Sequence, residues 1–276
     1  MKRFVVAVVA AAGVAVAPVQ AVAHERQAHE GQRVDIAVGV GGFDAPSTIS
    51  AGAVTFSVST SDPAGAWLGL VRLRAGVSRE RYLADLTRAM GPEPVEGGRA
   101  VAKDAEMLGG VAVARTPAAV TVRVSPGDYL LVDFRDVGLP DLADRVRPVR
   151  VVPGPGGGHG PADQVVVVLD GRFVAPAAIS GSVRVVNLSP HVNEAMLMPV
   201  RPGTTDADLG AFFRGTGPAP FTGGPTGVVP LSPGRSAVLD ADLPAGPYAL
   251  VTWVTDTRTG RMFAADGMRA LVRVGG

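Results

Sequence analysis

The sequence contains no cysteine, and only four of its residues are histidine. The absence of cysteine excludes disulfide bonds, a cysteine nucleophile and a thiolate metal ligand. With four histidines, the chain has few side chains that could act as a general acid or base near neutral pH. Charged residues are also few, at 18%, and the net charge is +1, which gives no electrostatic basis for binding nucleic acid or an anionic membrane surface.

Glycine, proline and short apolar runs are what the chain has in abundance. It contains Gly 36 and Pro 23, and 47% of its residues are hydrophobic, with valine recurring in short runs. This composition is typical of many short strands joined by turns. A length of 276 residues accommodates two domains of ordinary size.

The N-terminus has the pattern of a secretory signal peptide. Lys2 and Arg3 precede an apolar core, and Ala21-Val22-Ala23 forms a cleavage site of small residues. The apolar run from Phe4 to Val19 contains Pro18 and is shorter than the roughly 20 residues of a spanning helix. We therefore expect residues 1–23 to be removed, a secreted, extracellular protein that begins at His24, and no membrane span after cleavage. Residues 24–33 are polar and are expected to form a flexible tail.

The remaining chain repeats itself. Phe43–Ser50 matches Phe173–Ser180 at five of eight positions, and Tyr129–Val132 matches Tyr248–Val251 in the same order. A glycine- and proline-rich linker at 153–163 separates the copies, so we expect domains at 34–152 and 164–276. We expect each domain to be stabilised by its own hydrophobic core. We also expect proteolysis in the linker to release two folded halves. His159 within the linker is expected to be a solvated spacer residue.

Each copy is predicted to consist of strands with one short helix inserted. Ser78 and Thr205 are the expected N-caps of the two helices, and Asp240 and Asp242 are expected to alternate outward from a strand. The predicted strands are Ala53–Val58, Leu68–Leu73, Val120–Val124, Val183–Val186, Glu194–Met198, Ser236–Leu243 and Tyr248–Val254.

The second copy resembles the cupredoxin-like domains of secreted bacterial proteins, of the plastocyanin and azurin superfamily. The resemblance is carried by Asn187 to Glu194, by Ala245-Gly246-Pro247-Tyr248, by Gly260 and by Gly267-Met268. It extends more loosely to the first copy. The resemblance implies an all-β fold of two tandem cupredoxin-like Greek-key β-sandwich domains, each with a short helical insertion.

Carried onto this sequence, the copper-ligand positions of that family fall at Asn193, Thr252, Phe263 and Met268, of which only Met268 matches the family. A blue-copper centre needs a thiolate and two imidazoles besides the weak methionine ligand. The resemblance therefore implies a degenerate copper site, and we expect no cofactor and no bound metal.

Two copper-based alternatives stay open. Met196, Met198, Met262 and Met268 offer thioethers that suit Cu(I) if the fold brings them together. Alternatively, a mature N-terminal His24 could chelate copper through its amine and ring, as in a copper enzyme, if His29, His159 or His191 reached the same metal.

The sequence carries no recognisable catalytic motif: it lacks a Gly-x-Ser-x-Gly elbow, a phosphate loop, and a histidine placed beside a plausible nucleophile. We therefore expect a non-catalytic binding or structural module rather than an enzyme. Its expected partner is an extracellular protein or a cell-wall component.

Overall fold

The computed structural model describes residues 31–154, 156–158 and 160–275. The predicted signal peptide, residues 24–30 of the predicted tail, and His159 lie outside these residues. The first strand begins at Gln32, so the last two residues of the predicted tail belong to a strand instead. Exposed Arg33 and Asp35 alternate with buried Val34 and Ile36, so Arg33 fits the pattern of that strand.

Within the described residues, strands dominate both halves of the chain. The elements of the first half are β1 (Gln32–Gly39), β2 (Gly42–Phe43), β3 (Thr48–Ser50), β4 (Gly52–Thr60), β5 (Ala66–Leu73), α2 (Arg79–Ala89), α3 (Pro94–Asp104), β6 (Ala105–Val113), β7 (Ala118–Val124), β8 (Gly127–Asp133), η1 (Phe134–Asp136), α4 (Leu142–Arg145) and β9 (Arg147–Val152). Those of the second half are β10 (Gln164–Leu169), β11 (Arg172–Val174), β12 (Ala178–Ile179), β13 (Val183–Asn187), β14 (Asn193–Pro199), α5 (Asp206–Phe213), β15 (Thr226–Leu231), β16 (Ser236–Ala241), β17 (Gly246–Val251) and β18 (Arg269–Val274).

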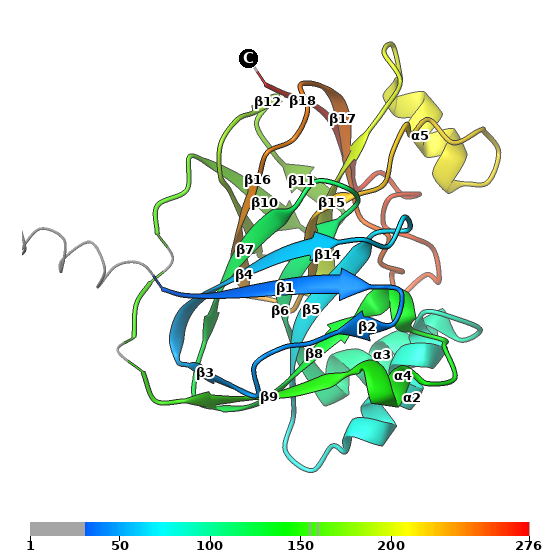
Figure 1. Cartoon of the computed structure of the whole chain (residues 1–276). Helices are drawn as coiled ribbons and strands as arrows, with labels where there is room; N and C mark the ends of the chain where they lie inside the picture. Colours follow the sequence, from blue (N-terminus) through cyan, green and yellow to red (C-terminus); the bar gives the residue numbers. More distant parts are fainter. Residues whose placement is uncertain (1–30, 155, 159, 276) are drawn as a thin grey trace, which may run out of the picture.

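The strands form two sheets that pack face to face (Figure 1). The eight-stranded sheet has the order β11-β10-β13-β16-β7-β4-β1-β2. The ten-stranded sheet has the order β12-β18-β17-β14-β15-β6-β5-β8-β9-β3. The all-β sandwich expected from the sequence is therefore confirmed.

The two halves have the same internal strand order. In the first half β1 pairs in parallel with β4, and β3 pairs in parallel with β9. In the second half the same places are taken by the parallel pairs β10 with β13 and β12 with β18. The matching sequence segments around Phe43 and Phe173 fall in the corresponding strands β2 and β11.

Both sheets continue from one half into the other. β7 pairs antiparallel with β16 over five residue pairs, and β6 pairs antiparallel with β15. In the strand order, β7 corresponds to β16 and β6 corresponds to β15. Each half thus contributes the corresponding two strands to the junction. The expectation that each domain stands on its own core is wrong, because apolar side chains of both halves form one continuous cluster between the sheets. The division into domains at 34–152 and 164–276 stays a prediction about the chain's organisation.

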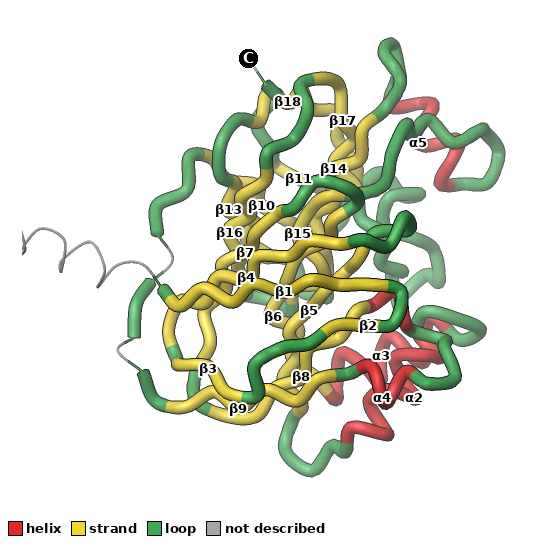
Figure 2. Tube along the Cα trace, viewed as in Figure 1, coloured by secondary structure: helices red, strands yellow, loops and turns green. Residues whose placement is uncertain are grey.

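A second apolar cluster covers the outer face of the ten-stranded sheet. The helices lie on this side of the strands (Figure 2). The outward residues of the eight-stranded sheet are mostly more exposed, as the alternating burial of β1 illustrates. The two faces of the sandwich therefore differ, and the helices add a third layer to only one of them.

The helix starts follow the predicted caps. The Ser78 hydroxyl accepts a hydrogen bond from Arg81 N, and Thr205 with Asp208 forms a capping box. Within this first helix region Tyr82 is fully buried, whereas Met90 is 49% exposed because α2 ends one residue before it.

The helix α3 is an element that the sequence pattern does not predict. Its two central glycines, Gly97 and Gly98, are poor helix formers. Gly97 lies against the backbone of α2, where a β-carbon would come within 2.7 Å of Ala89 Cα. The first half therefore carries a pair of packed helices instead of the single short helix expected, and tertiary packing outweighs the local propensity of the glycines.

No helix among the described residues is both long enough and apolar enough to cross a membrane.

Limited proteolysis is expected to cut within residues 153–163 but to leave the two fragments in one particle. Most described residues of this segment are exposed, and exposed glycine-rich segments are preferred cleavage sites. The ladders β7–β16 and β6–β15 would still join the fragments after the cut. Denaturing electrophoresis should show two bands, and native size-exclusion chromatography one peak. Fragments that elute separately would show that the halves are independent after all.

Candidate functional site

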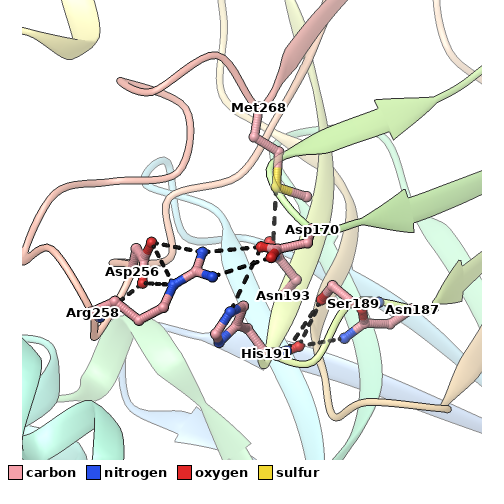
Figure 3. A network of polar contacts seen from close by, with 8 residues as sticks. All are labelled: Asp170, Asn187, Ser189, His191, Asn193, Asp256, Arg258 and Met268. Carbon is pink, nitrogen blue, oxygen red and sulfur yellow. Dashed lines mark hydrogen bonds and ion pairs between the residues drawn. The ribbon is translucent and has the colours of Figure 1, made fainter.

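The structure brings the side chains of two of the four predicted copper-ligand positions into contact. The Asn193 side-chain amide donates a hydrogen bond to Met268 Sδ at 3.5 Å (Figure 3), although the two residues lie far apart in sequence. Phe263 O accepts from Met268 N at 2.9 Å, and Phe263 N donates to Val254 O. Asn193, Thr252, Phe263 and Met268 are all buried; we call these four residues the aligned positions.

The side chains of the aligned positions do not fit a blue-copper centre. They supply an amide, a hydroxyl, a phenyl ring and one thioether, and the thioether accepts a hydrogen bond from the amide. The imidazole of His191 packs with its ring centroid 5.4 Å from the ring of Phe263. Without a thiolate, this donor set lacks the ligand on which Cu(II) binding of that kind depends.

Hydrogen bonds and ion pairs tie together the loops around the aligned positions (Figure 3). Asn187 Nδ2 donates to His191 O at 2.8 Å, and the Ser189 hydroxyl donates to Asn187 Oδ1. On the other side, Arg258 pairs with Asp256 and with Asp170. His191 Nε2 lies 3.7 Å from Asp170 Oδ1. The loops before β14 and after β17 are thereby held to Asp170, which follows β10, and to each other.

The four candidate Cu(I) methionines do not form one cluster. Met196 and Met198 share a face of β14, as their spacing predicts, but that face belongs to the outer apolar cluster. Met268 lies in the cluster between the two sheets, and Met262 is 38% exposed. Because the ten-stranded sheet separates Met268 from Met196 and Met198, the structure does not support a shared thioether site.

The main cavity of the described residues is a cleft of about 650 Å³ on the outer face of the ten-stranded sheet. One wall comes from α2 and α3 of the first half, and the other from the loop 253–263 of the second half. Arg99 of α3 donates to Thr257 O at 2.6 Å and so joins the two walls. The cleft therefore exists only where the two halves meet.

Most of the cleft lining is apolar. Both tryptophans of the chain, Trp67 and Trp253, line it, together with Met107. Met90 and Met262 contribute exposed apolar surface to the lining. Its titratable side chains are Arg74, His191 and Glu194. This arrangement is suited to a small ligand with an apolar body and one polar group.

Glu194 is the buried acid of the cleft. It is 4% exposed, and its Oε1 accepts a hydrogen bond from Trp253 N at 2.7 Å. Burial raises the pKa of its carboxyl to about 7, while the hydrogen bond from Trp253 acts in the opposite direction. Near neutral pH the carboxyl can thus be either a proton donor or an anion.

The sequence pattern predicts a strand at Glu194 but does not identify this residue as functional. The signal that could have found it is a lone acid within Asn193–Pro199, a run otherwise almost entirely apolar and buried. The role of Trp67 and Trp253 is not predictable, since they lie in different halves and are brought to one cleft only by the junction of β6 with β15. His24, His29 and His159 lie outside the described residues, so the N-terminal copper hypothesis stays a prediction.

The triple variant Asn193→His, Thr252→Cys, Phe263→His is expected to gain stoichiometric Cu(II) binding, with none expected for the wild type. If the alignment of these positions is right, the variant supplies a thiolate and two imidazoles in addition to the Met268 thioether. An intense thiolate-to-copper absorption band on copper titration checks this result. The double variant without Thr252→Cys is the control and should lack that band. A folded triple variant that binds no copper would contradict the alignment.

Comparisons with known proteins give matches only among solved structures. No family model matches the chain, and no curated protein matches it. Auracyanin A, a blue copper protein from Chloroflexus aurantiacus, is 20% identical over 44% of this chain and 99% of its own, with a TM-score of 0.30. A blue copper oxidase from Nitrosomonas europaea is 14% identical over 89% of this chain and 86% of its own, with a TM-score of 0.25.

A copper-containing nitrite reductase from Thermus scotoductus is 12% identical over 92% of this chain and 70% of its own, with a TM-score of 0.23. At TM-scores this low the similarities carry no argument about function. The fold class rests on the strands, the two sheets and the core between them.

Proposed function

We propose that this protein is a secreted, non-catalytic binding module that holds a small molecule with an apolar body in the cleft between its two halves. The observation that carries the proposal is the 650 Å³ cleft lined mainly by apolar side chains, including both tryptophans. Cavities of about 300–1,000 Å³ with few polar groups are typical of small-molecule sites.

The surface around the cleft supports the same proposal. Met90 and Met262 are two of the eight large apolar residues that are exposed in the described part of the chain, and both line this cleft. Exposed apolar residues gathered at one place indicate an interaction site, whereas single scattered ones do not. The cleft thus favours a small ligand over the cell-wall or protein partner expected from sequence alone.

The non-catalytic part of the proposal rests on the chemistry of the aligned positions. Asn193, Thr252 and Phe263 stand where the family resemblance would require two imidazoles and a thiolate. The identical strand order of the halves supports their origin from one duplicated cupredoxin-like domain. We infer that, after the duplication, the copper site within one domain was lost and the cleft between the two halves became the binding site.

Titration with the uncharged fluorescent probe N-phenyl-1-naphthylamine tests the proposal. The probe is expected to bind one to one, to increase its emission and to quench the tryptophans, since both line the cleft. Met262→Glu, which places a charge in the cleft lining, should weaken binding about tenfold. Leu271→Glu is the matched control, because Leu271 is 40% exposed on β18 and lies outside the lining. The proposal fails if the probe does not bind, or if both variants weaken binding equally.

A further inference from the structure

The carboxyl of Glu194 has an unused oxygen in the lining of the cleft. Its Oε1 is held by Trp253 N, but no described residue donates a hydrogen bond to Oε2, and no described cation forms an ion pair with the carboxyl. Buried carboxylates without a cationic partner are costly to desolvate. A ligand that enters the cleft can supply the missing partner.

The charged groups around the cleft do not provide that partner. Arg74 lines the cleft but its side chain is exposed and takes part in no ion pair among the described residues. His191 also lines the cleft, and its Nε2 lies 3.7 Å from Asp170 Oδ1. Arg258, in the loop after β17, pairs with Asp170 and Asp256. The strands β15 and β17, which flank β14, and the segments that follow them contribute Pro230, Ser232, Pro233 and residues of the loop 253–263 to the lining, and none of these lining side chains is titratable.

We propose that the cleft selects apolar amines, with the ammonium group of the ligand on Glu194 and its hydrocarbon body against the tryptophans and methionines. This inference rests on the proposed function and specifies its ligand class. An ammonium donates the hydrogen bonds that Oε2 lacks, and the pair is charge-assisted in a site of low polarity. An apolar carboxylate would instead bring a like charge to Glu194, and an alcohol would form only a neutral hydrogen bond.

The ionisation of Glu194 makes the amine preference depend on pH. Burial raises its pKa to about 7, so the carboxyl is mostly neutral at pH 5.5 and mostly ionised at pH 8. An alkyl ammonium is charged at both values, so it gains its ionic partner as the pH rises. Amine affinity should therefore increase about tenfold from pH 5.5 to pH 8, whereas the affinity of an apolar carboxylate should decrease.

Octylamine, octanol and octanoate form a matched set of probes for the mature protein, with binding measured by isothermal titration calorimetry at pH 5.5 and pH 8. At pH 8 octylamine is expected to bind at least tenfold more tightly than the other two. Glu194→Gln should remove this difference and the pH dependence of octylamine binding. Asp240→Asn, at an exposed aspartate outside the cleft, should leave both in place.

The outcomes separate this inference from the proposed function. If the three probes bind equally, or if octanoate binds most tightly, the amine preference is overturned while the cleft remains a binding site. If none of them binds, and N-phenyl-1-naphthylamine does not bind either, the proposed function itself fails. Because the wild-type pH dependence requires no substitution, the inference stays testable even if Glu194→Gln does not fold.

Discussion

Leu231→Ala is expected to lower the free energy of unfolding by about 2–5 kcal/mol and to destabilise both halves of the chain together. Leu231 is fully buried at the end of β15. It pairs with Leu108 of β6 in the first half and with Asn193 of β14 in the second. Its side chain packs on Gly109, where a β-carbon would lie 2.8 Å from Leu231 Cδ2. Truncation therefore leaves a cavity at the junction itself.

The two tryptophans allow the halves to be followed separately in urea. In Trp253→Phe the fluorescence reports on Trp67 in the first half, and in Trp67→Phe it reports on Trp253 in the second. With Leu231→Ala added, both reporters should shift to the same lower midpoint, since one continuous core supports both halves. Leu271→Ala, at an exposed position on β18, should change neither by more than about 0.5 kcal/mol. A shift confined to Trp253 would mean that the halves unfold independently.

Glu194→Gln is expected to stabilise the protein at pH 8 and to have little effect below pH 4.5. The ordinary pKa of a glutamate carboxyl is 4.5, and burial in the folded protein raises the pKa of Glu194 to about 7. The folded state therefore binds more protons than the unfolded state between these values, so wild-type stability falls as the pH rises through this window. This decrease in the free energy of unfolding of the wild type amounts to roughly 3 kcal/mol, and it is complete above pH 7.

Glutamine has nearly the shape of glutamate and can still accept the hydrogen bond from Trp253 N, but it carries no charge. Thermal unfolding from pH 4 to pH 9 should show the stability of wild type and variant diverging as the pH rises, with the variant more stable at the alkaline end. Asp240→Asn is the control for removing an acid from an exposed position and should run parallel to wild type. A variant that is less stable than wild type at pH 8 would show that the carboxylate has a partner.

Tyr82 is a different kind of buried group. Its hydroxyl is fully buried and finds no hydrogen-bond partner among the described residues, and burial raises its pKa well above the usual range. It lies in the outer apolar cluster on α2, so it remains neutral at every pH at which the protein is expected to fold. Tyr82 therefore does not contribute to the pH dependence of stability between pH 4.5 and 7.

Several elements of the fold could be predicted from local sequence because local chemistry decides them. Ser78 and Thr205 start helices by accepting backbone hydrogen bonds within their own first turn. The alternation in Glu194–Met198 places Met196 and Met198 on one face of a strand whatever lies beside it. Likewise, the resemblance alone predicts that Asn193 and Met268 lie together, and the two side chains are in contact.

What the sequence by itself determined was thus the class of fold and the absence of a thiolate for copper. The tertiary structure alone decided that β6 joins β15 and β7 joins β16, because strand pairing between halves depends on which edges meet and not on the pattern within either strand. The same junction brings Trp67 to the same cleft as Trp253 and Glu194. It also leaves Glu194 without an ion-pair partner among the described residues, and burial then raises its pKa to about 7, which no single segment of the chain specifies.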